Sequence, residues 1–316
     1  MTTKLEKDII PTKDTKLKLA GIIEIPPVAI GCWQWGDKKV WKWTPKAEKD
    51  AKEAFDKAFE LGISFYDTAE IYGDGESERE IKRFRESYSD EEKAKQVIAT
   101  KFFPHAHRTQ FPDVLLSALK DSLSRLGVFK VDLYQIHAAV HPASIEVVAN
   151  ALADAYEAGL VKAVGVSNYG IDDVKQMHAA LQKRNLSLAS NQVSYSLIRT
   201  IPEKSALGMG LLTCKYLPTG PFPKGREKPF MKFDTEQLTR LLSALNKLSE
   251  RYKKAPSAIA LNWCIVKGTV PLGGARTAEH VKQNAEALGF RLTKEEVAEL
   301  DILSFLGSNN RGWQHG

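Results

Sequence analysis

The chain has 316 residues, of which 43% are hydrophobic and 27% are charged. This composition supplies enough apolar residues for a sizeable core and excludes disordered, collagen-like and coiled-coil chains. No apolar run approaches the ~18 to 20 residues that a membrane span needs, so no membrane partner is predicted. The length fits one or two domains, and single α/β barrels commonly reach this size.

The net charge is +6, from 45 Lys and Arg residues against 39 Asp and Glu residues. The basic residues are scattered among acidic ones, and no basic stripe carries interleaved aromatic residues. The sequence therefore predicts no nucleic-acid partner.

The three cysteines, Cys32, Cys214 and Cys264, are widely spaced and form no CxxC motif. This spacing predicts neither a disulfide framework nor a zinc site, and it favours a reducing compartment. The first 16 residues lack the apolar segment of a secretory signal and carry acidic residues, which transit peptides avoid. We therefore expect a cytoplasmic protein without a metal site.

In chain order, we expect an antiparallel hairpin within residues 4–25 and then strands that alternate with helices. The expected strands are 28–31, 63–66, 97–100, 131–136, 161–166, 188–192 and 269–272. The expected helices are about 46–61, 76–87, 111–126, 144–158 and 170–185. Thr44 and the pair Asp172-Asp173 are expected to cap two of these helices.

Repeated alternation of strands and helices predicts a parallel sheet, either doubly wound or closed into a (β/α)₈ barrel. No linker divides the sequence, so residues 1–316 are expected to form one domain. The polar tail, 301–316, is expected to lie as a flap over another part of the molecule.

Polar residues follow five consecutive expected strands, and this pattern favours the barrel. They are Asp67, Lys101, His137, the pair Ser167-Asn168, and Gln192. Each one alone is more often a turn, a helix cap or a structural side chain. Together they predict a site at the carboxyl ends of the strands, where parallel α/β folds place function. A doubly wound sheet would not normally use every strand end.

Tyr72 follows Asp67 by five residues and completes a set that can protonate a carbonyl oxygen. The pKa of a tyrosine is about 10, and the ammonium of Lys101 is expected to lower it. Asp67 is expected to pair with Lys101, and His137 to orient the carbonyl or share in the proton transfer. No reactive cysteine or Ser-His-Asp set is evident, so the electrons should come from a cofactor. No full GxGxxG follows a first strand, so a nicotinamide cofactor would not bind in a Rossmann fold.

The sequence resembles the aldo-keto reductase superfamily, through segments that follow family order over nearly the whole chain. The segments are 31–37 (GCWQWGD), 65–78 (FYDTAEIYGDGESE), 97–102 (VIATKF), 131–137 (VDLYQIH), 159–169 (GLVKAVGVSNY), 191–197 (NQVSYSL), 207–216 (LGMGLLTCKY) and 271–284 (PLGGARTAEHVKQN). The tryptophan-rich stretch 33–41 is similar to the plant and algal pyridoxal-reductase-like branch.

The resemblance implies an NADPH-dependent reductase of a small-molecule aldehyde or ketone on a (β/α)₈ barrel. It implies a catalytic tetrad of Asp67, Tyr72, Lys101 and His137, and a substrate wall that includes Trp33, Tyr72 and His137. The implied cofactor contacts are Gly31, Cys32, Trp33, Asp67, Ser167, Asn168, Gln192, Ser205, Leu207, Gly210, Gly274, Ala275, Arg276, Gln283 and Asn284. Of these, Ser167, Asn168 and Gln192 would hold the nicotinamide carboxamide. Arg276 would bind the 2′-phosphate, because a guanidinium matches two oxygens at once.

One departure from the family pattern concerns the barrel itself. Only nine residues, 198–206, stand where the family has a helix and a seventh strand. A parallel crossover needs ~10 to 12 residues before any strand is counted. We therefore predict that one βα unit is missing and that the barrel is open or distorted. Two alternatives to the enzyme follow: an NADPH-binding regulatory module similar to the channel-associated β-subunits of this family, or an inactive truncated isoform.

Overall fold

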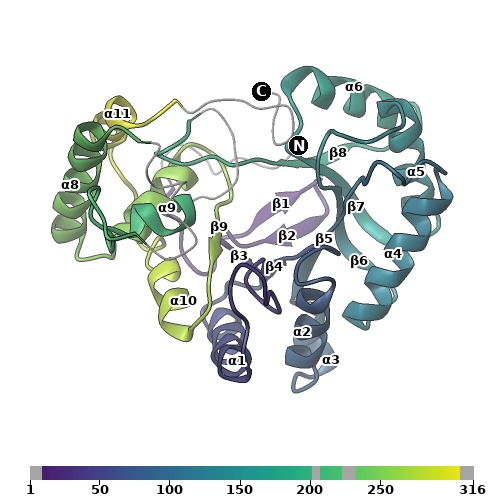
Figure 1. Cartoon of the computed structure of the whole chain (residues 1–316), viewed down its shortest axis with the longest axis horizontal. Coiled ribbons are helices and arrows are strands. Elements are labelled where there is room, and N and C mark those ends of the chain that lie inside the picture. Colours follow the sequence, from purple (N-terminus) through teal and green to yellow (C-terminus); the bar gives the residue numbers. More distant parts are fainter. Residues whose placement is uncertain (1–8, 201–206, 223–232, 307–316) are drawn as a thin grey trace.

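The computed structural model describes residues 9–200, 207–222 and 233–306. These residues form a curled sheet of seven parallel strands (Figure 1). The strands are β3 (Ala29–Gly31), β4 (Phe65–Asp67), β5 (Val97–Phe102), β6 (Val131–Ile136), β7 (Val161–Ser167), β8 (Leu188–Gln192) and β9 (Leu272–Gly274). Their order is β8-β7-β6-β5-β4-β3-β9, so each strand from β3 to β8 pairs with the next in sequence.

The sheet is open between β8 and β9, which form its two edges. Among the described residues from 193 to 271, no strand fills this gap. The prediction of a barrel that lacks its seventh strand is confirmed. Every other strand of the barrel pattern is present and parallel.

The expected hairpin is present as β1 (Leu17–Leu19) and β2 (Ile23–Ile25), which pair antiparallel within the curve of the sheet (Figure 1). Its apolar side chains alternate with polar ones, as a half-buried hairpin requires. They pack on inward-facing strand residues that include Phe65, Val97 and Leu133. The hairpin therefore fills the interior of the sheet beneath the strand ends. Residues 4–8 of the expected hairpin lie outside the described residues.

Helices cover the outer face of the sheet, and all but the short helix at 90–94 lie where the sequence predicts them. They are α1 (Pro45–Glu60), α2 (Glu76–Arg85), α3 (Asp90–Ala94), α4 (Asp113–Leu126), α5 (Ile145–Glu157) and α6 (Ile171–Gln182). Thr44 caps α1, because its side chain accepts a hydrogen bond from the Ala47 amide at 3.2 Å. The predicted cap at Asp172-Asp173 is wrong: Gly170 is the cap, and the two acids lie in the first turn of α6.

The C-terminal part is helical: α8 (Thr235–Tyr252), α9 (Pro256–Val266), α10 (Ala278–Ala285) and α11 (Lys294–Leu303). Helices α8, α9 and α11 share an apolar cluster with Leu197 and Leu211. The predicted strand at 269–272 is displaced, because β9 begins only at Leu272, where the chain comes into register with Ala29 of β3.

The tail departs from the predicted flap in its described part. Residues 301–303 complete α11, and the Phe305 amide donates to the Leu197 carbonyl at 2.9 Å. Residues 304–306 therefore lie against residues 197–200, where the shortened segment begins. Residues 307–316 lie outside the described residues. No helix in the described ranges is long and apolar enough to cross a membrane.

The open edges lead to a prediction about association. Among the residues that the structure describes, strands β8 and β9 each pair on one side only, and unpaired strand edges are templates for further strands. We expect the purified chain to self-associate as its concentration rises, measured by sedimentation velocity from 1 to 100 µM. A species that stays monomeric across this range would show that other parts of the chain shield both edges.

Candidate active site

Alternate residues of three neighbouring strands turn into the barrel, apolar at the bottom and polar at the carboxyl end. On β4 the inward pair is Phe65 and Asp67, and on β5 Lys101 follows Val97 and Ala99. On β6 the polar inward residues are Gln135 and then His137 directly after the strand. Because side chains of a strand alternate between its two faces, the inward-facing residues recur at every second position. The last inward residues of these strands are polar and lie together at the carboxyl end of the barrel.

Asp67 and Lys101 form a buried ion pair at the centre of this polar level. Lys101 Nζ donates to Asp67 Oδ2 at 2.7 Å and to the Thr68 carbonyl at 2.7 Å. The Lys101 side chain has no exposed surface, and burial lowers its pKa although Asp67 opposes the shift. Desolvation of two charges is costly, so such a pair is weak evidence for stability and points to a role in the site.

Tyr72 lies above this ion pair and next to His137. Lys101 Nζ is 5.1 Å from the centre of the Tyr72 ring, and the rings of Tyr72 and His137 meet edge to face at 5.6 Å. Gly73, next to Tyr72, packs closely against the loop 33–37. A Cβ at this position would lie 2.8 Å from the Gly36 backbone, so a glycine is needed there.

The predicted effect of Lys101 on Tyr72 is wrong. Burial raises the pKa of Tyr72 well above its usual value, and the nearby Asp67 carboxylate adds to the rise. The charge of Lys101 is already engaged by Asp67, which explains why it does not depress the pKa of the phenol. Tyr72 is therefore a protonated group at neutral pH, as a proton donor must be.

Ser167, Asn168 and Gln192 meet at the ends of β7 and β8. The Ser167 hydroxyl and the Asn168 amide both donate to the Gln192 carbonyl, at 2.9 and 3.0 Å. Asn168 takes the left-handed conformation (φ 62°), which asparagine tolerates. Its side-chain amide donates to the His137 carbonyl at 2.8 Å and to Ser167 Oγ at 3.0 Å. Its Oδ1 is buried and has no partner, so an acceptor is left for a ligand.

A second ion pair joins the loop after β4, which carries Tyr72, to the loop after β5. Glu70 Oε1 accepts from Arg108 at 2.5 Å and from the Phe103 amide at 2.6 Å. Arg108 also donates to the Phe103 carbonyl at 3.0 Å and covers the Phe102 ring at 4.8 Å. The Phe103 ring in turn meets the His137 ring edge to face at 5.6 Å. This clamp joins the segment that carries Tyr72 to the aromatic group beside His137.

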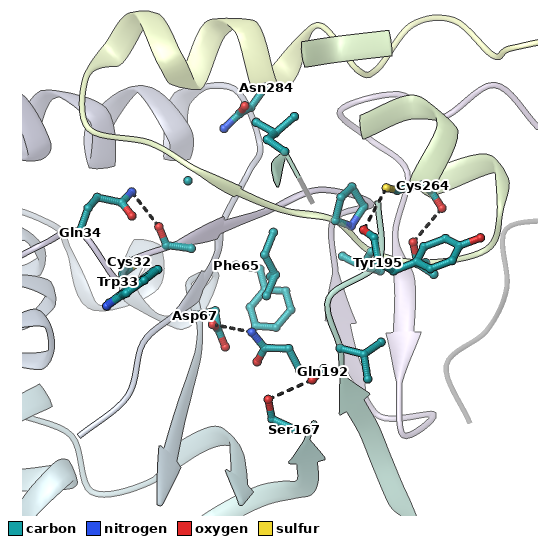
Figure 2. Close-up of a pocket in the computed structure, with 18 of the residues that line it drawn as sticks. Cys32, Trp33, Gln34, Phe65, Asp67, Ser167, Gln192, Tyr195, Cys264 and Asn284 are labelled. Atoms are coloured by element: carbon teal, nitrogen blue, oxygen red, sulfur yellow. Dashed lines mark hydrogen bonds between the residues drawn. The ribbon is translucent and has the colours of Figure 1, made fainter. Parts of the chain in front are cut away.

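One cavity of about 920 Å³ runs from the strand ends to the C-terminal helices, and it is bordered by Asp67, Tyr72, His137, Ser167 and Gln192. Figure 2 shows Asp67, Gln192 and Ser167 in the lower part of the pocket and Tyr195 and Cys264 toward its upper right. Trp33 and Trp41 stand at the mouth with their rings edge to face at 5.6 Å. This volume is in the range of cofactor and ligand pockets.

The end of the cavity near α10 is cationic. Arg276, Lys215 and His280 line it, and Arg276 lies over the Trp41 ring at 6.0 Å. Burial lowers the pKa of His280, and the charges of Arg276 and Lys215 lower it further. Asn284 is buried beside them, and its Nδ2 has no partner. The Arg276 guanidinium and the Lys215 ammonium on one wall suit an anion such as a phosphate.

Most predicted site residues are brought together in this cavity. Those that line it are Gly31, Cys32, Trp33, Asp67, Tyr72, His137, Ser167, Gln192, Leu207, Gly210, Gly274, Arg276, Gln283 and Asn284. Lys101, Asn168 and Ala275 are buried behind it. The Ala275 carbonyl accepts from Gln34 and Trp35, both at 2.9 Å, and so joins β9 to the tryptophan loop. Ser205 lies outside the described residues.

Sequence reasoning missed several residues of the site. Gln135 stands two residues before His137, so the strand period could have placed it on the same inward face. Lys215 and His280 lie within motif segments, but their meeting with Arg276 depends on tertiary structure. No group of three or more His, Cys, Asp or Glu within the described ranges is arranged to hold a metal ion.

The sequence matches a known protein family and is similar to characterised members of it. The sequence model of the aldo/keto reductase family matches residues 27–304. The chain is 35% identical to the chloroplastic pyridoxal reductase of Arabidopsis thaliana, over 90% of this chain and 85% of that protein. It is 26% identical to the aldo-keto reductase YhdN of Bacillus subtilis, over 89% of this chain and 90% of that protein.

Solved structures share the fold. A glycerol dehydrogenase from Gluconobacter oxydans matches with a TM-score of 0.78 and 26% identity, over 97% of this chain and 98% of its own. An aldo/keto reductase from Klebsiella pneumoniae, solved with NADP and acetate, matches with a TM-score of 0.69 and 22% identity, over 94% of this chain and 98% of its own.

The clamp between Glu70 and Arg108 can be tested through stability. Arg108→Leu removes the partner of a carboxylate that is only 7% exposed, and an unpaired buried charge is costly. We expect the free energy of unfolding, measured by urea denaturation, to fall by about 2 kcal/mol. This is below the ~3 to 5 kcal/mol of a fully buried pair, because Arg108 is 20% exposed.

The matched control is Lys183→Leu, which removes an ion pair with Glu146 whose side chains are 67% and 60% exposed. Exposed pairs contribute about 0 to 1 kcal/mol, so this variant should unfold close to the wild type. Equal losses for the two variants would contradict the clamp.

Proposed function

This chain belongs to the aldo/keto reductase family, and we propose that it reduces an aldehyde or ketone to the alcohol with NADPH as the reductant. The observation that carries the proposal is the buried Asp67–Lys101 pair beneath Tyr72 and His137, at one end of a cavity whose other end is cationic. The Klebsiella relative of the same fold was solved with NADP.

The donors and acceptors of the site suit a nicotinamide cofactor. Asn168 Oδ1, just behind the cavity wall, is a buried acceptor without a partner, and Gln192 presents its amide to the cavity. Together they match a carboxamide, which offers both N–H donors and a carbonyl acceptor. At the far end, Arg276 and Lys215 suit a phosphate, and Asn284 Nδ2 suits a ring nitrogen. When bound, the cofactor supplies a hydride to the carbonyl carbon.

In the proposed reaction Tyr72 gives its phenolic proton to the carbonyl oxygen as that oxygen gains negative charge. The oxygen becomes an alkoxide, which is a much stronger base than a phenolate, so a tyrosine with a raised pKa can still protonate it. Lys101 Nζ lies 5.1 Å from the centre of the Tyr72 ring and positions the tyrosine above the ion pair. Asp67 holds Lys101 in place, and His137 orients the carbonyl oxygen beside Tyr72.

Within the carbonyl compounds, we propose a flat aromatic aldehyde as the preferred substrate. Trp33 and Trp41 form an aromatic wall at the cavity mouth, and aromatic rings bind one another by stacked or edge-to-face contact. The Arabidopsis relative is named as a reductase of pyridoxal. We further propose the cytoplasm as the compartment on the sequence grounds above, although the name of the Arabidopsis relative places that protein in the chloroplast.

A module that binds NADPH without turnover is the second candidate, and the open sheet between β8 and β9 favours it. A titration of the chain with NADPH, followed by quenching of tryptophan fluorescence, tests binding for both candidates. A screen of aromatic and aliphatic aldehydes, followed by loss of NADPH absorbance, then separates them. Binding without turnover of any carbonyl would favour the module, and absence of binding would contradict both.

Tyr72→Phe tests the proton donor. It removes only the hydroxyl, and general acid catalysis contributes about 10²- to 10⁴-fold, so kcat should fall by that factor. The dissociation constant for NADPH should stay within about twofold of the wild type. Because the pKa of Tyr72 is raised, the donor keeps its proton below that pKa, and the wild-type rate should not fall through its titration between pH 6 and 9. Substantial activity in Tyr72→Phe would assign the acid to another group.

Arg276→Ala tests the phosphate end. Loss of a charge-assisted hydrogen bond should weaken NADPH about 10- to 100-fold and leave NADH nearly unchanged, measured by the same fluorescence titration. Lys282→Ala, on an exposed face of α10 and outside the cavity lining, is the matched control and should bind both cofactors as the wild type does. Equal weakening of both cofactors by Arg276→Ala would contradict the assignment.

A further inference from the structure

We propose that Gln135 is a positioning residue that fixes how the edge strand β8 presents Gln192 to the cofactor and how Asp67 faces Lys101. The inference rests on the proposed function, because it concerns the same site. Gln135 lies on β6, is 1% exposed and pairs in register with Lys101 on one side and Gly165 on the other.

The Gln135 amide closes a hydrogen-bonded triangle across the barrel. Its Nε2 donates to Gln192 Oε1 at 3.2 Å and approaches Asp67 Oδ1 at 3.4 Å. Gln192 Nε2 donates to the other Asp67 oxygen, Oδ2, at 3.1 Å (Figure 2). The same oxygen accepts from Lys101, so the triangle meets the catalytic ion pair directly.

The polarity of this triangle determines the orientation of both amides. An ionised carboxylate only accepts hydrogen bonds, so each amide must turn its NH₂ group toward Asp67. Gln192 then uses its Oε1 for Gln135, and its second N–H is left for the cavity that it lines. Without Gln135, rotation of the Gln192 amide would no longer cost a hydrogen bond at Oε1. Gln135 therefore selects a donor, not an acceptor, for the carboxamide oxygen of the cofactor.

The edge position of β8 explains why a bridge across the barrel is needed. Within the described residues β8 pairs only with β7, and the register between them shifts next to Val166. Ser190 of β8 donates to Gln135 Oε1 at 3.3 Å, so two residues of this edge strand are joined to β6. Gly165 of β7 makes room, because a Cβ there would lie 2.3 Å from Ser190 Oγ and 3.1 Å from Gln135 Cγ.

The first test compares Gln135→Leu, which keeps the bulk and removes the polar group, with the wild type. We expect NADPH to bind about tenfold more weakly to Gln135→Leu in a fluorescence titration, since two neutral hydrogen bonds are lost. Tyr134→Phe, next to Gln135 but on the opposite face of β6 and outside the cavity lining, is a matched control and should bind NADPH as the wild type does.

The second variant, Gln135→Glu, adds a carboxylate opposite Asp67. Two adjacent carboxylates cannot both ionise easily, so one should take up a proton near neutral pH. NADPH affinity of Gln135→Glu should then change with pH between 5 and 8 more steeply than that of the wild type. An NADPH affinity of Gln135→Glu that follows the wild-type pH dependence would show that the side chain at this position does not act on the cofactor site.

A measurement without cofactor separates the inference from the proposed function. In the ¹H–¹⁵N NMR spectrum of the apoprotein, the two side-chain NH₂ signals of Gln192 should be shifted from the positions of a free glutamine amide, and in Gln135→Leu both signals should move toward those positions. Retention of both the signals and the NADPH affinity in Gln135→Leu would overturn the inference. If the signals change but the wild type binds no NADPH, the positioning role stands and the proposed function fails.

Discussion

The candidate site is arranged around one buried ion pair, Asp67–Lys101. A lysine without exposed surface needs a partner for its charge, and Asp67 supplies it at 2.7 Å. The carboxylate is itself buried and receives further N–H groups from Gln192 and Gln135. The four side chains come from β4, β5, β6 and β8. The hydrogen bonds that compensate the buried charges therefore join four strands of the sheet. Burial lowers the pKa of Lys101 and raises that of Tyr72, and both shifts work against charge in this pocket.

The open sheet keeps this arrangement because the gap lies beside the site. The ion pair and its neighbours depend on the continuous run β4 to β8, and the cationic end depends on β9, which pairs with β3. Helix α9 is buried along most of its length, as expected for a helix that is apolar on all sides. Tyr195, which borders the cavity, stacks on Trp263 of this helix at 5.0 Å. The packing of α9 and the hydrogen bonds of Gln135 thus support the edge strand β8, which in a closed barrel would pair with a seventh strand.

The sequence allowed prediction of the strand ends but not of their surroundings. Asp67, Lys101, His137 and Gln192 could be placed together because parallel strands end at one edge. The leucines of α8 recur with a helical period, so the sequence contains a signal for this helix. Helix α9 gives no such period, because its faces are all apolar. The meeting of Glu70 with Arg108 and the direction of the Tyr72 pKa shift depend on tertiary burial, which local sequence does not encode.

Two unpartnered polar atoms lie near opposite ends of the cavity, one behind its wall and one on its lining, and their chemistry differs. Asn168 Oδ1 is an acceptor whose orientation is set, because the Nδ2 of the same amide is used by His137 and Ser167. Asn284 Nδ2 is a donor buried beside the cationic wall. A buried polar atom without a partner costs about 1 to 3 kcal/mol, so folding alone gives no reason to keep either one. A ligand that offers a donor at the catalytic end, and an acceptor and negative charge at the other, would recover that free energy. A nicotinamide dinucleotide phosphate offers these groups in that order along its length.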